Sequence, residues 1–351
     1  MTHASAEDIL TALGGLLLER IPGNPVRNEI IRNVESGPDG VELELNMPSP
    51  EHPRLAEAEA AIRRAIAEVP GAGKVRIRSG WSVRTPEPGT APPLPGVKTV
   101  LAVASGTGGV GKSTVSAYLA VALSRMGLRV GLLDADIHGP SAALALGDPG
   151  APGIHEGQKL SPARIQGVDF LSMSHLIPED QAVVWRGPML HQMVLQFASA
   201  AWEDLDILVL DLPPGTGDVQ LTVTQSLPVT GALVVTTPQE IALIDARRGL
   251  RMFQDAKIPV VGLVENMAHW ECSCGKRHTV FGEGGGERLS QEADVPLLTG
   301  IPLDPAAYQS PSGPPEGGTP GAAVFHALAV QVATALGGLA MKRNPFRVLS
   351  A

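Results

Sequence analysis

The feature that most constrains this chain is a glycine-rich loop between an apolar strand and a helix. Residues 106–113 read GTGGVGKS and match the pattern G-x-x-x-x-G-K-[ST] of loops that bind phosphate. The apolar run at 97–105 predicts a strand before the loop, and apolar residues at helical spacing from Val115 to Met126 predict a helix after it. The helix N-terminus adds positive partial charge beside the backbone N–H groups of the loop. Strand, loop and helix in this order predict a nucleotide-binding α/β domain.

The residue types within the loop predict separate roles. The Lys112 ammonium suits the β- and γ-phosphates of ATP, and the Ser113 hydroxyl suits Mg²⁺. The alternative is a glycine-rich turn with a chance Lys-Ser pair, which the flanking strand and helix disfavour. The candidate nucleotide contacts in the loop and beside it are Gly106, Thr107, Gly108, Gly109, Val110, Gly111, Lys112, Ser113 and Thr114.

Acidic side chains follow two of the predicted buried strands. Asp211 ends one strand, and we expect it to bind Mg²⁺ through a water molecule. Asp134 and Asp136 follow another strand and are the candidate catalytic residues, because a carboxylate there can orient an attacking water. Gly215 or Gly217, in the loop after Asp211, is expected to offer an N–H group to the γ-phosphate. The alternative is that Asp134 and Asp211 only cap the segments that follow them.

Near-continuous apolar runs alternate with helical segments from Val97 onward. Runs without polar alternation indicate strands buried on both faces, as in a parallel sheet. We therefore expect an α/β fold with a doubly wound, mainly parallel sheet that binds its ligand at the carboxyl ends of the strands. Asn266 ends one such strand and is by position a candidate adenine contact, or only a turn residue. The strands are expected at residues 97–105, 129–133, 207–210, 232–236, 260–264 and 297–301.

Two domains and a linker are predicted. Residues 1–84 read as a small α+β domain, and residues 85–96 contain five prolines, which indicates an extended linker. The nucleotide-binding domain is predicted at 97–340 and a tail at 341–351. In the small domain, helices are expected at 7–19 and 55–69 and strands at 41–45 and 75–77.

The composition of the chain disfavours several classes of partner. A net charge of −9 and an aromatic content of 3% disfavour nucleic-acid binding and base stacking. No 18 consecutive residues are apolar, so no membrane span is predicted. Two cysteines in 351 residues cannot form a disulfide framework, which points to a reducing compartment. We therefore expect a cytoplasmic protein with neither a nucleic-acid partner nor a membrane partner.

Several blocks beyond the loop carry a family resemblance. DADIHGPS at 134–141, DLPPGTGDVQLTVTQ at 211–225, VVTTPQEIALIDARRG at 234–249, VENM at 264–267, FGEGGGERL at 281–289 and IPLDP at 301–305 follow GTGGVGKST in order. Together they resemble the Mrp/ApbC-type iron–sulfur cluster carrier ATPases, which belong to the MinD-like class of P-loop proteins. Residues 1–83 resemble, more weakly, the iron–sulfur-assembly domain often fused ahead of such ATPases.

The resemblance implies an ATP-hydrolysing homodimer that binds a [4Fe–4S] cluster. It also implies that the cluster passes to apo iron–sulfur proteins and that a cluster-assembly scaffold is a partner. The chain departs from the family pattern at three places. Thr107 stands where the class has a signature lysine that reaches the partner's nucleotide, so slow hydrolysis is expected. The metal motif is Cys272-Ser-Cys274 rather than Cys-x-x-Cys, and His52 replaces an N-terminal cysteine.

The two cysteines are candidate iron–sulfur ligands. Two thiolates cannot fill the four ligand positions of a cubane cluster, whereas two chains related by a two-fold axis supply four. The sequence leaves other interpretations open: a zinc site that adds His269 and His278, or two thiols without a role. A disulfide between Cys272 and Cys274 ranks last, because the compartment is reducing and the ring would be tight.

Two other functions fit the same loop. One is a MinD/ParA-like positioning ATPase without a cluster, which needs an amphipathic membrane tail or a basic DNA-binding patch. The last ten residues contain a proline, and the net charge is −9, so neither feature is evident. The other is a small-molecule ligase or kinase, for which the sequence shows no substrate pocket.

Overall fold

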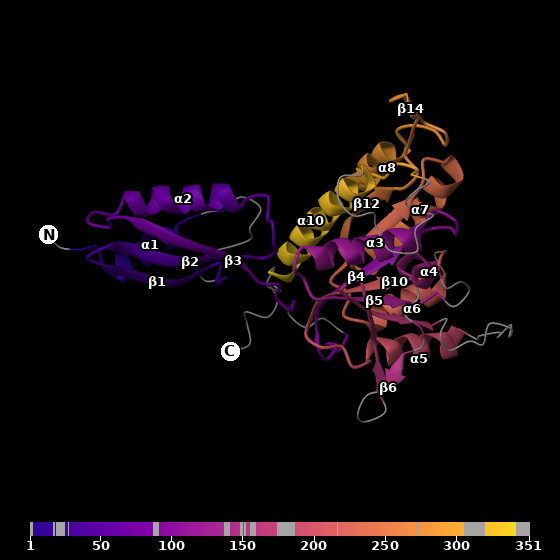
Figure 1. Ribbon diagram of the computed structural model, residues 1–351, viewed down its shortest axis with the longest axis horizontal. Coiled ribbons are helices and arrows are strands. Elements are labelled where there is room, and N and C mark those ends of the chain that lie inside the picture. Colours follow the sequence, from indigo (N-terminus) through magenta and orange to yellow (C-terminus); the bar gives the residue numbers. More distant parts are fainter. Residues whose placement is uncertain are drawn as a thin grey trace. The chain divides into compact units, whose positions relative to one another are not determined.

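The chain forms two compact units in the computed structural model (Figure 1). The first unit comprises residues 1–87 and 333–351, and the second comprises residues 88–332. The predicted nucleotide-binding domain extends to residue 340, whereas the structure assigns the chain from Ala333 onward to the first unit. The structure describes residues 3–16, 18, 25–26, 28–86, 91–136, 141–147, 150, 152–154, 159–173, 187–215, 217–272, 274–304 and 320–341.

The first unit contains a three-stranded sheet with the strand order β1-β2-β3. The central strand pairs antiparallel with β1 and parallel with β3. Its side chains alternate between buried and half-buried, and Val41, Leu43 and Leu45 pack in one core with Ile62 and Ile66 of the second helix. The elements are α1 (Ala6–Gly14), β1 (Ile31–Gly37), β2 (Gly40–Met47), α2 (Leu55–Ala67) and β3 (Val75–Trp81).

Two features of this unit differ from the sequence-based expectation. The first helix ends at Gly14 with Gly15 as its C-cap, not near residue 19, because consecutive glycines favour a helix end. Strand β1 was not predicted, since its sequence IRNVESG lacks the regular alternation that marks β2. The predicted strands at 41–45 and 75–77 lie within β2 and β3.

The second unit is built on an eight-stranded sheet with the order β15-β12-β11-β4-β10-β5-β9-β8. All neighbouring strands are parallel except β8 and β9, so the predicted doubly wound, mainly parallel sheet is confirmed. Each of the six expected strands is present. The strands are β4 (Val97–Ala104), β5 (Val130–Asp134), β8 (Ala163–Ile165), β9 (Val168–Ser172), β10 (Leu205–Asp211), β11 (Gly231–Thr236), β12 (Val260–Glu265) and β15 (Leu297–Gly300).

Helices and two short hairpins complete this unit. Helix α3 packs against α4 and several strands, and α7 packs against α8 and β11. The helices are α3 (Lys112–Arg125), α4 (Ser141–Leu146), α5 (Gly187–Ala198), α6 (Asp218–Ser226), α7 (Glu240–Asp255) and α8 (Gly285–Ala293). The hairpins pair β6 (Gly153–Ile154) with β7 (Leu160–Ser161) and β13 (Trp270–Glu271) with β14 (Arg277–His278). The β13–β14 hairpin lies at the top of Figure 1, in orange.

The last helix, α10 (Pro320–Ala340), is strongly apolar. Within the described residues its segment Gly321–Ala340 is long and apolar enough, by length and composition, to cross a membrane. Its side chains Phe325, Leu328 and Val332 are buried inside the protein, and the Phe325 ring packs edge-on against Tyr118 of α3 at 5.3 Å. The core helices of other proteins are also long and apolar enough to meet this criterion. The expectation of no membrane partner therefore stays a prediction.

Candidate functional site

The glycine-rich loop joins the carboxyl end of β4 to the first turn of α3. Gly109 and Gly111 have φ angles of 81° and 82°, the left-handed conformation that glycine adopts without strain. Gly106 lies against the backbone of α7, where a Cβ would collide with Asp245 and Ala246. The loop therefore needs glycine for its own turns and for the close approach of a neighbouring helix.

Lys112 and Asp211 form a buried ion pair at this edge of the sheet. The Lys112 Nζ donates a hydrogen bond to Asp211 Oδ1 at 2.8 Å, and the two side chains are 5% and 0% exposed. The Ser116 hydroxyl donates to the same oxygen at 2.7 Å. No described residue donates a hydrogen bond to Asp211 Oδ2, although this atom is buried. One carboxylate oxygen is thus held by the chain and the other is left for a ligand.

Asp134 lies beside Asp211, because β5 and β10 are parallel neighbours and pair these two residues in register. Asp134 is fully buried; its Oδ1 accepts the Asp136 N–H at 3.0 Å and its Oδ2 accepts the Ser172 hydroxyl at 3.2 Å. Burial, followed by the repulsion of the Asp211 charge, raises the pKa of Asp134 to about 8. Such an acid caps the segment after β5 and stays protonated near neutral pH. The half-buried Asp136 is the better-placed candidate to orient water.

Asn266 reaches the phosphate loop from the end of β12. Its Nδ2 donates to the Val110 carbonyl oxygen at 2.8 Å, and the residue is 1% exposed. A small pocket beside it is lined by Thr114, Tyr118, Pro302 and other residues of the same unit. The structure thus places the predicted adenine contact against the loop itself, next to this pocket.

The remaining predicted residues of the loop region are arranged around Ser105. Its carbonyl oxygen accepts the Gly215 N–H at 3.0 Å, so this N–H group is engaged within the chain. Its hydroxyl donates to the Thr107 carbonyl oxygen at 2.9 Å. Thr107 is half-buried, whereas Gly108 and Gly109 are exposed. Of the block at 134–141, residues 137–140 lie outside the described residues.

The chemistry of this edge fits a nucleotide with Mg²⁺. The loop supplies backbone N–H groups and one ammonium for phosphates, and Ser113 and Asp211 supply the hydroxyl and carboxylate oxygens that Mg²⁺ prefers. The Ser113 Oγ lies 3.3 Å from Lys112 Nζ, which bonds Asp211 in turn. The hydroxyl, ammonium and carboxylate that sequence reasoning assigned to one site are therefore in contact.

Sequence reasoning missed two hydroxyl groups at this edge. Ser116 follows Lys112 by four residues, so helix periodicity places both on one face of α3, and this spacing was a usable signal. Ser172 ends β9, a strand that was not predicted, and its bond to Asp134 follows only from the pairing of β9 with β5. Strand order cannot be derived from the spacing of motifs.

The two cysteines lie in the turn of the β13–β14 hairpin. Cys272 and Cys274 form a disulfide, so the ranking of this state as the last alternative is wrong. The Cys272 N–H donates to the Lys276 carbonyl oxygen at 3.0 Å, and the Gly275 N–H donates to the Cys272 carbonyl oxygen at 2.9 Å. This short turn brings the two sulfur atoms together in spite of the tight ring. Cys274 is exposed and Cys272 half-buried, so the pair is accessible from solvent.

The zinc interpretation does not fit the hairpin. Within the described residues, no group of three or more histidine, cysteine or acidic side chains is arranged to hold a metal ion. The His278 ring stacks on Trp270 with centroids 5.4 Å apart, and His269 Nε2 lies 3.9 Å from a Glu271 oxygen. His52, in the first unit, is buried and accepts the Arg54 N–H at its Nδ1. The histidines therefore have contacts other than the cysteines.

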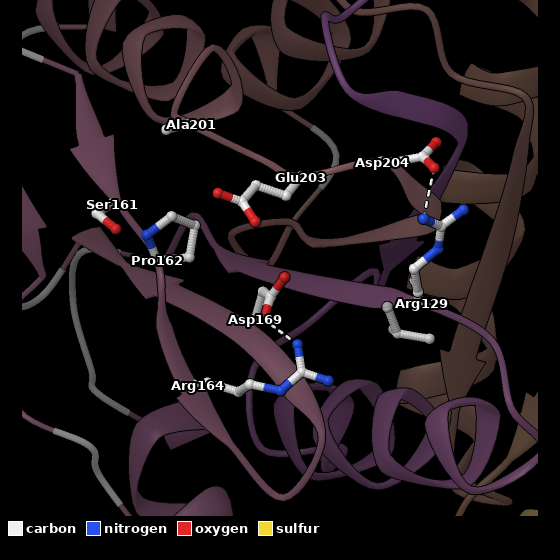
Figure 2. A pocket seen from close by; sticks show the side chains of 9 residues that line it. Arg129, Ser161, Pro162, Arg164, Asp169, Ala201, Glu203 and Asp204 are labelled. Atoms are coloured by element: carbon white, nitrogen blue, oxygen red, sulfur yellow. Dashed lines mark hydrogen bonds and ion pairs between the residues drawn. The ribbon is translucent and has the colours of Figure 1, made fainter. Parts of the chain in front are cut away.

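A larger pocket opens at the opposite, amino-terminal edge of the sheet. Figure 2 shows the side chains that line it. Its volume is about 550 Å³, and none of the predicted site residues lines it. Arg164 pairs with Asp169 at 3.0 Å, and Arg129 pairs with Asp204. Each of the two arginines thus has a carboxylate partner. Since no predicted site residue lines this pocket, the glycine-rich loop remains the candidate nucleotide site.

Comparison with known families gives two matches that together cover most of the chain. Residues 96–319 match the family described as NUBPL iron-transfer P-loop NTPase. Residues 6–78 match the family described as iron-sulfur cluster assembly protein. The boundary between these matches falls in the proline-rich segment.

Curated relatives are similar over most of their length. The iron-sulfur cluster carrier protein of Deinococcus radiodurans is 48% identical over 278 residues, which are 78% of this chain and 78% of that protein. The protein of the same description from Synechocystis is 41% identical and covers 86% of this chain and 87% of its own length.

Solved structures show the same fold. A nucleotide-binding protein from Archaeoglobus fulgidus, in complex with ADP, is 37% identical with a TM-score of 0.55, over 62% of this chain and 86% of that chain. The cell division ATPase MinD of Pyrococcus furiosus aligns with a TM-score of 0.51 and 23% identity, over 67% of this chain and 98% of that chain. The second likeness concerns the fold alone.

Proposed function

Because this chain belongs to the family of NUBPL iron-transfer P-loop NTPases, we propose that it is an ATP-dependent carrier of iron–sulfur clusters. The observation that carries the proposal is the pair of solvent-accessible cysteines in the same unit as a complete phosphate loop. Curated relatives described as iron-sulfur cluster carrier proteins support it. Its cargo would be a [4Fe–4S] cluster, and its clients would be apo iron–sulfur proteins of the cytoplasm, with a cluster-assembly scaffold as donor.

ATP would bind at the phosphate loop in place of the internal ion pair. Lys112 would turn from Asp211 to the β- and γ-phosphates, which carry more negative charge than one carboxylate. Ser113 and the freed Asp211 would hold Mg²⁺, which when bound neutralises phosphate charge. Asp136 would orient the attacking water. Thr107 has no charge to present to a second subunit, so hydrolysis would be slow.

The cysteine hairpin would hold the cargo in its reduced form. A dithiol reductant, itself oxidised to a disulfide, supplies the two electrons and two protons that convert the Cys272–Cys274 disulfide into two thiols. Their thiolates are the ligands that iron–sulfur clusters take. One hairpin then supplies two thiolates, and a cluster with four thiolate ligands needs a second hairpin from another copy of the chain. A homodimer bridged by the cluster meets this requirement.

Anaerobic reconstitution with iron and sulfide tests the proposal. After reduction with dithiothreitol, the protein is expected to hold about one [4Fe–4S] cluster per dimer, seen by iron analysis, visible absorption and size-exclusion chromatography. Cys272→Ser and Cys274→Ser should each abolish stable loading and leave ATP binding intact, because serine is a poor ligand for iron in such clusters. Retention of the cluster by the double serine variant would refute the carrier function.

A further inference from the structure

The hydrogen bond from Asn266 to the phosphate loop lies at the start of the segment that carries the cysteines. Asn266 Nδ2 and the Val110 carbonyl oxygen are 2.8 Å apart in a buried environment. A Cβ on Gly111 would collide with the same Nδ2 and would lie 3.8 Å from the Met267 side chain. The Asn266 side chain therefore packs closely against the last residues of the loop, and the Met267 side chain lies near them.

The chain between Asn266 and Cys272 is held along its length. The Ala268 N–H donates to the Ile301 carbonyl oxygen at 2.9 Å, and the Leu303 N–H donates to the His269 carbonyl oxygen at 2.7 Å. Met267 has a φ of 57°, an uncommon conformation for a residue with a side chain. The hairpin begins directly afterwards with Trp270. A shift at Asn266 therefore reaches the hairpin through a bonded segment.

The Val110–Gly111 peptide group gives this contact a link to the nucleotide. The Val110 carbonyl and the Gly111 N–H belong to one rigid, planar peptide group. In a phosphate loop the N–H groups point at phosphate oxygens. A phosphate that engages the Gly111 N–H fixes the same peptide plane whose oxygen Asn266 holds, and hydrogen bonds on the two sides of one peptide polarise each other.

We infer that Asn266 is a positioning residue that couples the phosphate loop to the cysteine hairpin, so that nucleotide binding changes the accessibility of Cys272 and Cys274. This inference rests on the proposed function, because it requires that a nucleotide binds at the loop. Beyond that function, it identifies the contacts through which the loop would control the release or retention of the cluster.

The test measures the rate at which iodoacetamide alkylates the two thiols in the reduced, full-length protein, with and without saturating ADP. Mass spectrometry follows each cysteine. In the wild-type protein, ADP is expected to change the rate by about fivefold or more, within the usual range of coupling between sites. In Asn266→Ala, and in the same-sized Asn266→Asp, the ratio of the two rates should approach one, because neither side chain donates to Val110. Calorimetry on the same samples verifies that ADP saturates each variant.

Gln254→Ala is the matched control. The Gln254 Nε2 also donates to a backbone carbonyl, that of Ala293, at 3.0 Å, but at the exposed surface of α7. This variant should keep the wild-type ratio. An unchanged rate in the wild-type protein at saturating ADP, or a wild-type ratio in both Asn266 variants, would overturn the coupling.

The labelling experiment needs no iron, so it separates the two ideas. A protein whose thiols respond to ADP but which retains no cluster would refute the carrier function and leave the coupling standing. A protein that loads its cluster but whose alkylation rates do not change with ADP would refute the coupling and leave the carrier function standing.

Discussion

The phosphate-loop edge and the cysteine hairpin differ in how they are held. At the loop edge Lys112, Asp211 and Asp134 are all buried, and each is fixed by partners from other strands or helices. The hairpin has two strands of two residues each, and its sulfur atoms face a turn open to solvent. Substitutions in a buried charged site strongly reduce stability, because the loss of one partner leaves the other buried without a compensating charge or hydrogen bond. Substitutions in an exposed turn usually change stability little. The comparison predicts that substitutions at the loop strongly affect nucleotide binding or stability, and that substitutions at the hairpin affect stability little.

The largest effect is expected for Lys112→Ala. Removal of the ammonium leaves Asp211 buried without its cation and removes the mobile positive charge of the loop. Loss of one partner of a buried charge pair costs up to ~4 kcal/mol, or ~10³-fold in affinity. Isothermal titration with ATP measures the loss.

Lys98→Ala is the matched control at the other edge of the same sheet. Lys98 Nζ bonds Asp206 at 2.7 Å, but its side chain is 27% exposed. This variant should bind ATP like the wild-type protein. Equal affinities of the two variants would show that Lys112 does not bind the nucleotide.

Thr107→Lys is expected to change turnover and not affinity. A cation aimed at charge that develops in the transition state can increase a rate by ~10³-fold, and we expect a lysine at this half-buried loop position in a dimer to give a part of that, roughly tenfold or more. A phosphate-release assay at saturating ATP measures it. Unchanged turnover in protein shown to dimerise would mean that hydrolysis does not depend on a cation at this position.

Asp134→Asn should remove a pH dependence of stability. The pKa of Asp134 is about 8 in the folded protein and 3.8 in its ordinary state, so the folded chain binds the proton more tightly. Stability contributed by the protonated acid is therefore present below pH ~4 and lost as the pH rises through ~8. The wild-type protein, free of Mg²⁺ and nucleotide, is expected to lose more than ~1 kcal/mol between pH 5 and 8.

Urea unfolding at several pH values checks this expectation. The neutral asparagine keeps the shape of the protonated acid, so the slope of stability with pH in this range should become smaller. A variant with the same slope as the wild-type protein would place the titrating group elsewhere.

The smallest effect is expected for Arg277→Ala in the hairpin. Arg277 Nε and Glu271 Oε1 are 2.8 Å apart, but the two side chains are 70% and 43% exposed. Exposed pairs of this kind contribute about 0–1 kcal/mol. Thermal unfolding should shift by less than ~2 °C, and a larger loss would mean that the hairpin is anchored more firmly than its contacts suggest.

The sequence predicted most of the loop edge because local patterns determine it. Continuous apolar runs located β4, β10 and β12, and the motif placed Lys112 and Ser113 at the start of a helix. The edge strand β8 and its neighbour β9 were missed, since β8 has only three residues and Asp169 interrupts the apolar run of β9. The fold class was predictable because one long parallel sheet imposes a regular pattern on the whole chain.

The sequence was sufficient to predict which residues belong to the candidate site, but not which of them contact one another. The sequence left a capping role open for Asp134, and only its burial and contacts in the structure favour that role over a catalytic one. The disulfide was ranked last because a reducing compartment and a tight ring disfavour it, and neither argument takes account of the hydrogen-bonded turn that brings the two sulfur atoms together. The bond from Asn266 to Val110 joins positions far apart in the chain, and no periodicity encodes it.

The assignment of residues 333–351 to the first unit has a consequence for synthesis on the ribosome. The core of that unit includes Met341, the Ser49 and Thr334 hydroxyl oxygens lie 3.4 Å apart, and Gly337 packs on Pro48. A nascent chain emerges at about 5–20 residues per second, so the roughly 250 intervening residues take on the order of 10–50 s to appear. During that interval the N-terminal sheet lacks the helical segment that begins at Ala333, and part of its apolar surface stays uncovered. The first unit to leave the ribosome is the last to be completed.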